Sequence, residues 1–312
     1  MRSSEVTPAV SVIMTVRNGA RYLGETLDAI LRQTFANFEL VINDNDSTDE
    51  TPNILRRYAA QDSRVRLLDP PGGGPKTFTQ GIARAFAAAR APLVAVNDGD
   101  DVPVPDRLQK QAAVLDRRPD VVLVASWYDE IDSEGRPLGT FRVPSEHEKL
   151  IDSFQSGNPV AHSSMMYRRP NAVAVGGYQE RLTYASDFAL SIALVAAGGK
   201  IAVIPESLMK MRVHAEQTSL MPDRQAERYR EPLEVLGLAS RLGGASWPAR
   251  LKGVLSRQKL ALRYGLALWN GGKRMQGLIE GGYWMFDALW SPVGVAVAQW
   301  RGRANAAAGG AR

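Results

Sequence analysis

Three carboxylates that follow a single apolar run are the residues of this chain best suited to chemistry. Asp98, Asp100 and Asp101 belong to the sequence Asn-Asp-Gly-Asp-Asp at 97–101, directly after Leu-Val-Ala-Val at 93–96. The run has the length and composition of a buried strand, and open α/β sheets bind ligands at the carboxyl ends of their strands. Clustered acids are costly without a neutralising charge, and hard divalent cations prefer carboxylate oxygens. The pattern therefore indicates a metal site with a phosphorylated substrate; the alternative is a solvated acidic loop that precedes the next helix.

Two further aspartates lie at the ends of predicted elements. Asp44 follows a predicted strand at 38–42 and is surrounded by turn-forming residues, so it is either a ligand-binding acceptor or a turn residue. Asp187 begins a predicted helix at 187–197. A carboxylate there either accepts a proton in a reaction or only favours the helix N-terminus.

Alternating strands and helices would position these aspartates. Strand patterns lie at 10–14, 38–42, 65–68, 93–96, 121–125, 163–167 and 201–204. Helical patterns lie between the early strands, with Ser47 or Thr48 as the expected cap of the helix that carries Ile54, Leu55 and Tyr58. A helix of roughly 77–90 precedes the strand at 93–96, and Pro105 opens another. This alternation predicts an α/β fold, a three-layer, mostly parallel sheet flanked by helices.

The chain beyond about residue 221 shows only helical patterns and a basic charge balance. Residues 250–312 contain ten Lys or Arg against two acids, a local charge of +8, whereas the whole chain carries +5. We expect a domain at 1–220 and a helical extension at 221–312. The nearly uncharged segment 281–300, with Trp284, Trp290 and Trp300, indicates an interfacial or helix-packing role. The basic tail suggests peripheral attachment to a membrane, or packing on the first domain or on a second copy.

Composition excludes several classes of protein. The chain has 312 residues, 45% hydrophobic and 23% charged, which is ordinary for a globular protein. It contains no cysteine, so disulfides and thiolate metal sites are excluded and a reducing cytoplasm is the expected setting. No signal-peptide pattern and no ordinary membrane span is evident. The positive charge is confined to the tail, which argues against nucleic acid as a partner.

Seven segments in order resemble a family 2 glycosyltransferase with the A-type nucleotide-sugar fold. They are VSVIMTVRNGARYLGETLDAILRQTF, FELVINDNDSTDET, APLVAVNDGDDVPVPDRLQKQAAVLDRRPDVVLVAS, NPVAHSSMMYRR, VGGYQE, YASDFAL and MRVHAEQTS. The similarity covers about residues 9–219. A single Asp-x-Asp would be a weak signal, whereas these segments in this order are specific.

The resemblance implies a role for each acidic position. Asp44 would accept the imide N–H of the donor base, which suits uracil or thymine and not cytosine. Asp98 would contact the ribose or metal-bound water, and Asp100 would be the best direct ligand of Mn²⁺ or Mg²⁺. Asp187 would be the catalytic base of an inverting transfer.

Other positions follow from the same resemblance. In the first loop, Thr15, Arg17 and Asn18 would line the nucleotide site, although the family commonly has Pro and Tyr where this chain has Thr15 and Arg17. Arg212 would neutralise phosphate and His214 would bind metal or phosphate. His162 has a weaker indication, toward the acceptor or toward packing. Ser186 replaces the usual glutamate before the base, so the role of that first acid is open.

These expectations describe a metal-dependent inverting glycosyltransferase. It would move a sugar from a UDP- or dTDP-sugar to a hydroxyl of a glycan or glycolipid acceptor, at the cytoplasmic face of the plasma membrane. The alternatives are a nucleotidylyltransferase and a nucleotide-sugar-binding protein without transfer. The first usually has a glycine-rich triphosphate loop, and residues 15–21 are poor in glycine.

Overall fold

The computed structural model describes residues 7–68, 77–217, 225–270, 276, 280 and 281. The chain comprises two compact units: residues 1–147 with 160–220, and residues 148–159 with 221–312. The two units divide near residue 220, as in the expected domains, except for segment 148–159. This segment belongs to the second unit although it lies within the sequence of the first. No helix among the described residues is long and apolar enough to cross a membrane.

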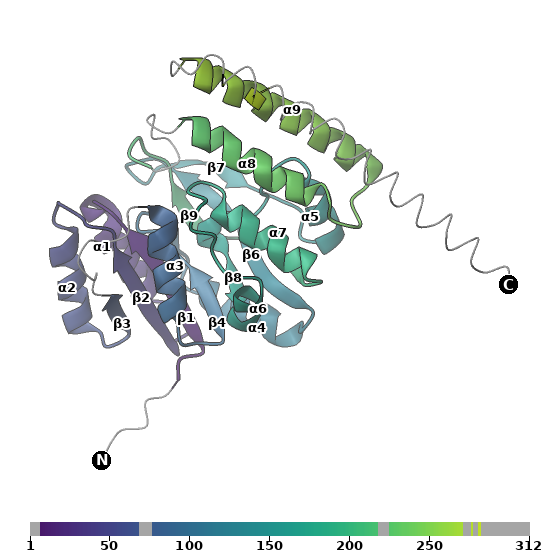
Figure 1. Cartoon of the computed structure of the whole chain (residues 1–312). Helices are drawn as coiled ribbons and strands as arrows, with labels where there is room; N and C mark the ends of the chain where they lie inside the picture. Colours follow the sequence, from purple (N-terminus) through teal and green to yellow (C-terminus); the bar gives the residue numbers. More distant parts are fainter. Residues whose placement is uncertain (1–6, 69–76, 218–224, 271–275, 277–279, 282–312) are drawn as a thin grey trace. The chain divides into compact units, whose positions relative to one another are not determined.

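Four parallel strands form the first half of the sheet in the first unit (Figure 1). They are β1 (Val10–Val16), β2 (Phe38–Asp44), β3 (Val65–Leu68) and β4 (Leu93–Val96), in the spatial order β3-β2-β1-β4. β1 is buried along its whole length and β2 to its last residue but one, which is why apolar residues dominate both strands despite buried Ser11 and Glu39. The strands expected here are confirmed, and the first two extend two residues further than expected.

Helices connect these strands and cover both faces of the sheet. They are α1 (Ala20–Leu31), α2 (Thr51–Gln61) and α3 (Phe78–Ala88). Leu23 of α1 and Leu55 of α2 pack with Val12 on one face. α3 packs on the other face, where a Cβ on Gly81 would lie 2.2 Å from Thr15 Oγ1. Only glycine allows α3 to approach the strands this closely.

The second half of the sheet is mixed. It contains β5 (Val102–Pro103), β6 (Val121–Ile131), β7 (Pro137–Phe141), β8 (Met166–Arg168) and β9 (Lys200–Arg212). β8 pairs antiparallel with both β4 and β6, whereas β6 and β9 are parallel. The α/β class is confirmed, and the parallel order expected from the strand–helix alternation holds for β1 to β4. β6 and β9 run six and eight residues beyond the apolar runs that predicted them.

The remaining described helices of the first unit are α4 (Arg107–Arg117), η1 (His162–Ser164), α6 (Arg169–Ala174) and α7 (Ser186–Ala196). Helix α5 (His147–Phe154) begins at the last residue of the unit's first segment and continues into the second unit. The expected cap of α2 was wrong. Its N-cap is Glu50, without a side-chain cap, because Ser47 accepts a hydrogen bond from the Asn18 amide and Thr48 donates one to Asn18 Oδ1.

An ion cluster lies near the start of β1 and β2. Buried Glu39 accepts hydrogen bonds from Ser11 Oγ (2.6 Å) and from the Arg90 amide (2.8 Å), and forms ion pairs with Arg66 and Arg90. Burial raises the pKa of Glu39, but these hydrogen bonds and charges outweigh burial and lower it below its ordinary value.

The second unit contains most of α5 with α8 (Gln225–Ala239) and α9 (Trp247–Asn270). Gln155 Nε2 donates to the Ala239 carbonyl (2.9 Å), and Asp152 accepts from the amide and hydroxyl of Ser246 (2.7 Å each). These contacts attach segment 148–159 to the two helices. The helical character expected beyond 221 holds for α8 and α9, whereas the tryptophan-containing part of segment 281–300 lies outside the described residues.

Candidate active site

The acidic loop after β4 is closed by an asparagine. Asn97 is buried, and its Nδ2 donates to the carbonyls of Asp98 (2.8 Å) and Asp101 (3.0 Å). A Cβ on Gly99 would lie 3.1 Å from Val16 Cγ2, so the loop packs tightly against the end of β1. The carboxyl ends of β1 and β4 thus meet at the loop, as expected for a ligand-binding edge.

Asp101 is a structural member of the loop. It is 2% exposed, and its Oδ1 accepts a hydrogen bond from the Arg212 amide at 2.9 Å. Burial, together with the charges of Asp100 and Asp98, raises the pKa of Asp101 well above its ordinary value. The side chain therefore connects the end of β9 to the loop.

Arg107 lies beneath the loop and was not among the residues expected from sequence. Its buried guanidinium donates to Asn97 Oδ1 (3.0 Å), to the Val96 carbonyl (2.7 Å) and to Gln111 Oε1 (3.0 Å). Burial lowers the pKa of Arg107 to about 9, against the opposing charges of Asp101 and Asp98, so the group remains charged at neutral pH. The spacing of Arg107, Gln111 and buried Leu115 along one face of α4 is the signal that points to an inward arginine.

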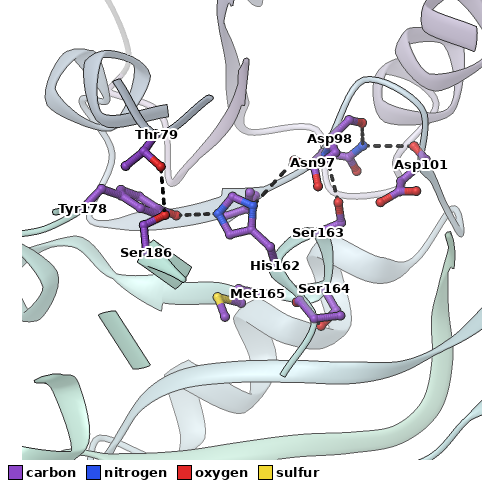
Figure 2. A network of polar contacts seen from close by, with 12 residues as sticks. Thr79, Asn97, Asp98, Asp101, His162, Ser163, Ser164, Met165, Tyr178 and Ser186 are labelled. Carbon is purple, nitrogen blue, oxygen red and sulfur yellow. Dashed lines mark hydrogen bonds and ion pairs between the residues drawn. The ribbon is translucent and has the colours of Figure 1, made fainter. Parts of the chain in front are cut away.

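Asp98 begins a polar chain that crosses the site (Figure 2). Its amide donates to Ser163 Oγ (3.0 Å), and its Oδ1 lies 3.6 Å from His162 Nδ1. The other ring nitrogen of His162 lies 3.0 Å from the Tyr178 hydroxyl. Burial raises the pKa of Asp98, but its contacts with His162 and Ser163 outweigh burial, with help from the charge of Arg107, and lower it.

His162 has the opposite shift. Burial lowers its pKa, but the interactions with Asp98 and the charge of Asp187 outweigh burial and raise it. His162 is therefore electrostatically coupled to two of the aspartates expected from sequence. The sequence alone gave His162 a weak indication and did not single out Tyr178.

Asp100 faces the other histidine of the site. Its Oδ2 lies 2.9 Å from His214 Nε2, and the His214 ring lies 4.9 Å from the ring of Tyr22, centroid to centroid. Burial and the charge of Asp98 raise the pKa of Asp100, and His214 opposes this effect. Asp100 and His214, each expected to bind metal, are therefore in direct contact, and their binding of metal stays a prediction.

Arg212 lies next to the contact between Asp100 and His214 and bonds to the Asp100 backbone. The residue is 2% exposed, and its Nη2 lies 2.7 Å from Glu25 Oε2, while its Nε donates to the Asp100 carbonyl at 3.3 Å. Its guanidinium carbon lies 4.6 Å from the Tyr22 ring centroid. These contacts give Arg212 an organising position, and its contact with phosphate stays a prediction.

Asp187 lies in the first turn of α7, where it is half-buried. Burial raises its pKa, although the charge of His162 opposes this effect. The neighbouring Ser186 is 4% exposed, and its Oγ lies 3.3 Å from Thr79 Oγ1 (Figure 2). Ser186 therefore joins α7 to α3. The carboxylate of Asp187, whose pKa is raised, is suited to accept a proton.

The residues expected to bind the nucleotide lie at the ends of β1 and β2. Val16 pairs with Asp44 in register, and Asp44 Oδ1 accepts the Ser47 amide (3.1 Å). Asn18 adopts a left-handed conformation, φ 50°, which the contacts with Ser47 and Thr48 stabilise. Arg17 is exposed at this edge, whereas the Thr15 side chain is 3% exposed and points toward Asn43.

The residues present fit a divalent cation that substrate helps to hold. Among the described residues no group of three His, Cys, Asp or Glu side chains forms a metal cage. Asp98 and Asp100 nevertheless have side chains 25% and 26% exposed. Asp98 Oδ1 and His214 Nδ1 are buried atoms that form no hydrogen bond with the described chain. Mg²⁺ and similar ions commonly bind one or two carboxylates together with substrate phosphates, which suits this donor set.

Comparisons with known proteins agree on one family. The model of glycosyl transferase family 2 matches residues 11–174. The putative glycosyltransferase EpsE of Bacillus subtilis is 31% identical over 211 residues, covering 66% of this chain and 73% of that protein. The amylovoran biosynthesis glycosyltransferase AmsE of Erwinia amylovora is 25% identical over 213 residues, covering 67% and 78%.

Solved structures share the fold. S. aureus TarS 1–349 in complex with UDP-GlcNAc superposes with a TM-score of 0.64 at 16% identity, covering 94% of this chain and 92% of that one. The mannosyltransferase PcManGT from Pyrobaculum calidifontis, in complex with GDP-Man and Mn²⁺, has a TM-score of 0.58 at 18% identity, covering 94% and 87%.

Proposed function

Because this chain belongs to glycosyl transferase family 2 and is a glycosyltransferase, we propose that it is a metal-dependent inverting enzyme that uses a UDP- or dTDP-sugar. One observation carries the proposal. Two partly exposed carboxylates, Asp98 and Asp100, each lie against a histidine at the carboxyl end of β4, and the first of these histidines is coupled to Asp187. The acceptor in this proposal is a hydroxyl of a glycan or of a lipid-linked sugar.

Asp44 supports the choice of donor. Its carboxylate accepts hydrogen bonds only, and uracil and thymine each present an N–H to such a group. Of the structural neighbours, TarS was solved with UDP-GlcNAc and PcManGT with GDP-Man. Guanine also presents N–H groups, so GDP-sugars belong in any test of the donor.

Asp100, Asp98 and His214 would hold Mn²⁺ or Mg²⁺ in this proposal. The ion would neutralise charge on the departing nucleoside diphosphate. Arg212 would keep Asp100 and His214 in place through its hydrogen bond to the Asp100 carbonyl. His162 would hold Asp98, whose lowered pKa keeps that carboxylate ionised at neutral pH.

Asp187 would act as the catalytic base. Inversion requires the acceptor hydroxyl to attack opposite the diphosphate, and a positioned carboxylate accepts the proton as the new bond forms. The raised pKa of Asp187, caused by burial, brings it closer to the operating pH and makes it a better proton acceptor. His162 limits that rise and so keeps the base ionised.

The acceptor and the cellular setting are inferred from a relative of this chain. AmsE is described as an amylovoran biosynthesis glycosyltransferase, which supports a polysaccharide or a lipid-linked precursor of the cell envelope as the acceptor of this chain. Such precursors would place the enzyme in the cytoplasm, at the inner face of the plasma membrane.

The test is a panel of UDP-, dTDP- and GDP-sugars with Mn²⁺, Mg²⁺ or EDTA, read by donor binding and by donor hydrolysis. Wild type should bind one donor in the presence of metal, and D100N should lose that binding. D187N should keep donor binding and lose about 10²- to 10⁴-fold in turnover. D116N, at an exposed position of α4, is the matched control and should behave as wild type.

Two results would contradict the proposal. If no nucleotide-sugar binds under any metal condition, the donor-site assignment is wrong. The second result is donor binding without turnover by both wild type and D187N with every acceptor preparation. It would favour a nucleotide-sugar-binding protein, the alternative that Ser186 in place of the usual glutamate leaves open.

A further inference from the structure

Helix α9 of the second unit exposes a row of large apolar side chains. Trp247, Leu251, Leu255, Leu262 and Leu266 are 73%, 52%, 58%, 55% and 53% exposed. We call these five residues the α9 stripe. With about 100° and 1.5 Å per residue, they fall within a sector of about 100° and extend over roughly 29 Å of the helix. Single exposed leucines are common on proteins, but five large apolar side chains on one sector, with Gln258 between Leu255 and Leu262, indicate a surface for an apolar partner.

The opposite side of α9 is already packed. Ala261, Tyr264 and Leu268 form a core with Leu233 of α8, and Gly253 approaches Gln155 so closely that a Cβ would lie 2.6 Å from its carbonyl oxygen. Arg257, also on this side, is 1% exposed. The helix therefore has one face fixed inside the second unit, and the α9 stripe is its outward face.

Positive charge borders the α9 stripe along one side. Lys252, Lys259 and Arg263 are exposed and fall in a sector about 40° wide next to the apolar one. The sequence of α9 contains no Asp or Glu. A helix with leucine and tryptophan on one sector, Lys and Arg on the next and no acid is the pattern that lies in the headgroup region of anionic bilayers.

We propose that the α9 stripe docks on the surface of a membrane that contains anionic lipid. The leucines would enter the boundary between headgroups and acyl chains, Trp247 would lie at headgroup level, and the three basic side chains would meet lipid phosphates. The helix would lie along the membrane and not cross it, in agreement with the hydropathy of the described helices.

Charge distinguishes this partner from a second copy of the chain. A symmetric antiparallel pairing of two α9 helices through the stripe would place the basic border of one helix against the basic border of the other. Like charges at such close range oppose the pairing, whereas an anionic bilayer attracts them.

The experiment is co-sedimentation of the full chain with vesicles, without donor or acceptor. Vesicles of phosphatidylcholine with phosphatidylglycerol should bind the protein, and phosphatidylcholine alone should bind it more weakly. The double variant L255E/L262E should weaken binding at least tenfold, since each leucine loses the gain of apolar burial. K252E/K259E should weaken binding to anionic vesicles, about fivefold or more for each charge removed, and leave any binding to phosphatidylcholine unchanged.

L138E provides the matched control. Leu138 is 58% exposed on β7 of the first unit, so this variant makes the same chemical change on an element other than α9 and should bind vesicles as wild type does. Far-UV circular dichroism of each variant confirms that a loss of binding is not a loss of fold.

Three outcomes overturn the proposal: wild type does not bind anionic vesicles, L255E/L262E binds as wild type does, or L138E loses binding equally. A fourth is self-association of the wild type that L255E/L262E abolishes, without vesicle binding, which would assign the stripe to a second copy. Because the assay involves no sugar transfer, its result is independent of the proposed reaction.

Discussion

Replacing Arg107 by methionine tests whether a buried cation holds the acidic loop in place. The change removes hydrogen bonds to Asn97 Oδ1, to the Val96 and Met165 carbonyls and to Gln111, and removes a buried positive charge beneath the loop. Loss of one partner of a buried charge network costs about 3–5 kcal/mol, consistent with about 1–3 kcal/mol for each buried acceptor left unsatisfied. We therefore expect R107M to lose about 3–5 kcal/mol of unfolding free energy.

Urea unfolding of the full chain, followed by circular dichroism, measures this loss. The midpoint should fall while the slope with urea stays constant, since the surface exposed on unfolding is unchanged. R117M is the matched control, because Arg117 is an exposed residue of the same helix, and its effect should stay within about 0.5 kcal/mol. R107K keeps the charge without the forked donors and should be intermediate. If R107M and R117M unfold at the same urea concentration, Arg107 does not support the loop as argued.

Three further predictions concern the sheet and the site. G81A should lower the free energy of unfolding by about 1–3 kcal/mol because the added methyl group would overlap Thr15 Oγ1. G24A is the control: a Cβ there would lie 3.9 Å from its nearest neighbour, so this variant should be neutral or stabilising. Equal melting temperatures of the two variants would show that Gly81 is not required for close packing. Hydrogen bonds and charges outweigh burial and lower the pKa of Glu39. The ionised carboxylate therefore stabilises the fold fully above the ordinary glutamate pKa, and this stabilisation is lost as the pH falls through the lowered pKa of the folded state. E39Q should therefore flatten the acid side of a stability–pH curve, and a curve parallel to that of wild type would exclude Glu39 as its source. R212K should reduce kcat/KM at least tenfold with little change in the metal requirement, because lysine cannot donate to the Asp100 carbonyl and to Glu25 at the same time. Unchanged kinetics would show that Arg212 does not organise the site.

The strands that the sequence predicts well are those buried on both faces. Apolar residues dominate β1, β2 and β4 because helices cover both sides of the sheet, although β1 contains Ser11 and Thr15 and β2 contains Glu39 and Asn43. β6 and β9 extend beyond their apolar runs with residues that are only partly buried, such as Tyr128 and Ser207, and no periodic pattern marks them. The antiparallel insertion of β8 also has no local signal, since pairing direction is a property of the whole chain.

The aspartates of the site are visible in sequence because they follow apolar strands, but their roles depend on partners distant in the chain. Asp101 and Asp100 are adjacent, yet one is buried beneath the Arg212 amide and the other meets His214. Arg107 shows the same limit: its spacing with Gln111 and Leu115 indicates the inward face of α4, but its partner Asn97 lies ten residues earlier in the chain and has no local signal.

The assignment of segment 148–159 to the second unit has a consequence for synthesis on the ribosome. Gln155 meets its partner Ala239 after 84 further residues, and Asp152 meets Ser246 after 94. At about 5–20 residues per second, the segment waits roughly 4–19 s for these partners. Leu150, Ile151 and Phe154, all buried in the finished protein, emerge long before α8 and α9 are made. Folding of the second unit therefore cannot be completed before α8 and the start of α9 are made, and until then this short helix has apolar side chains without their final partners.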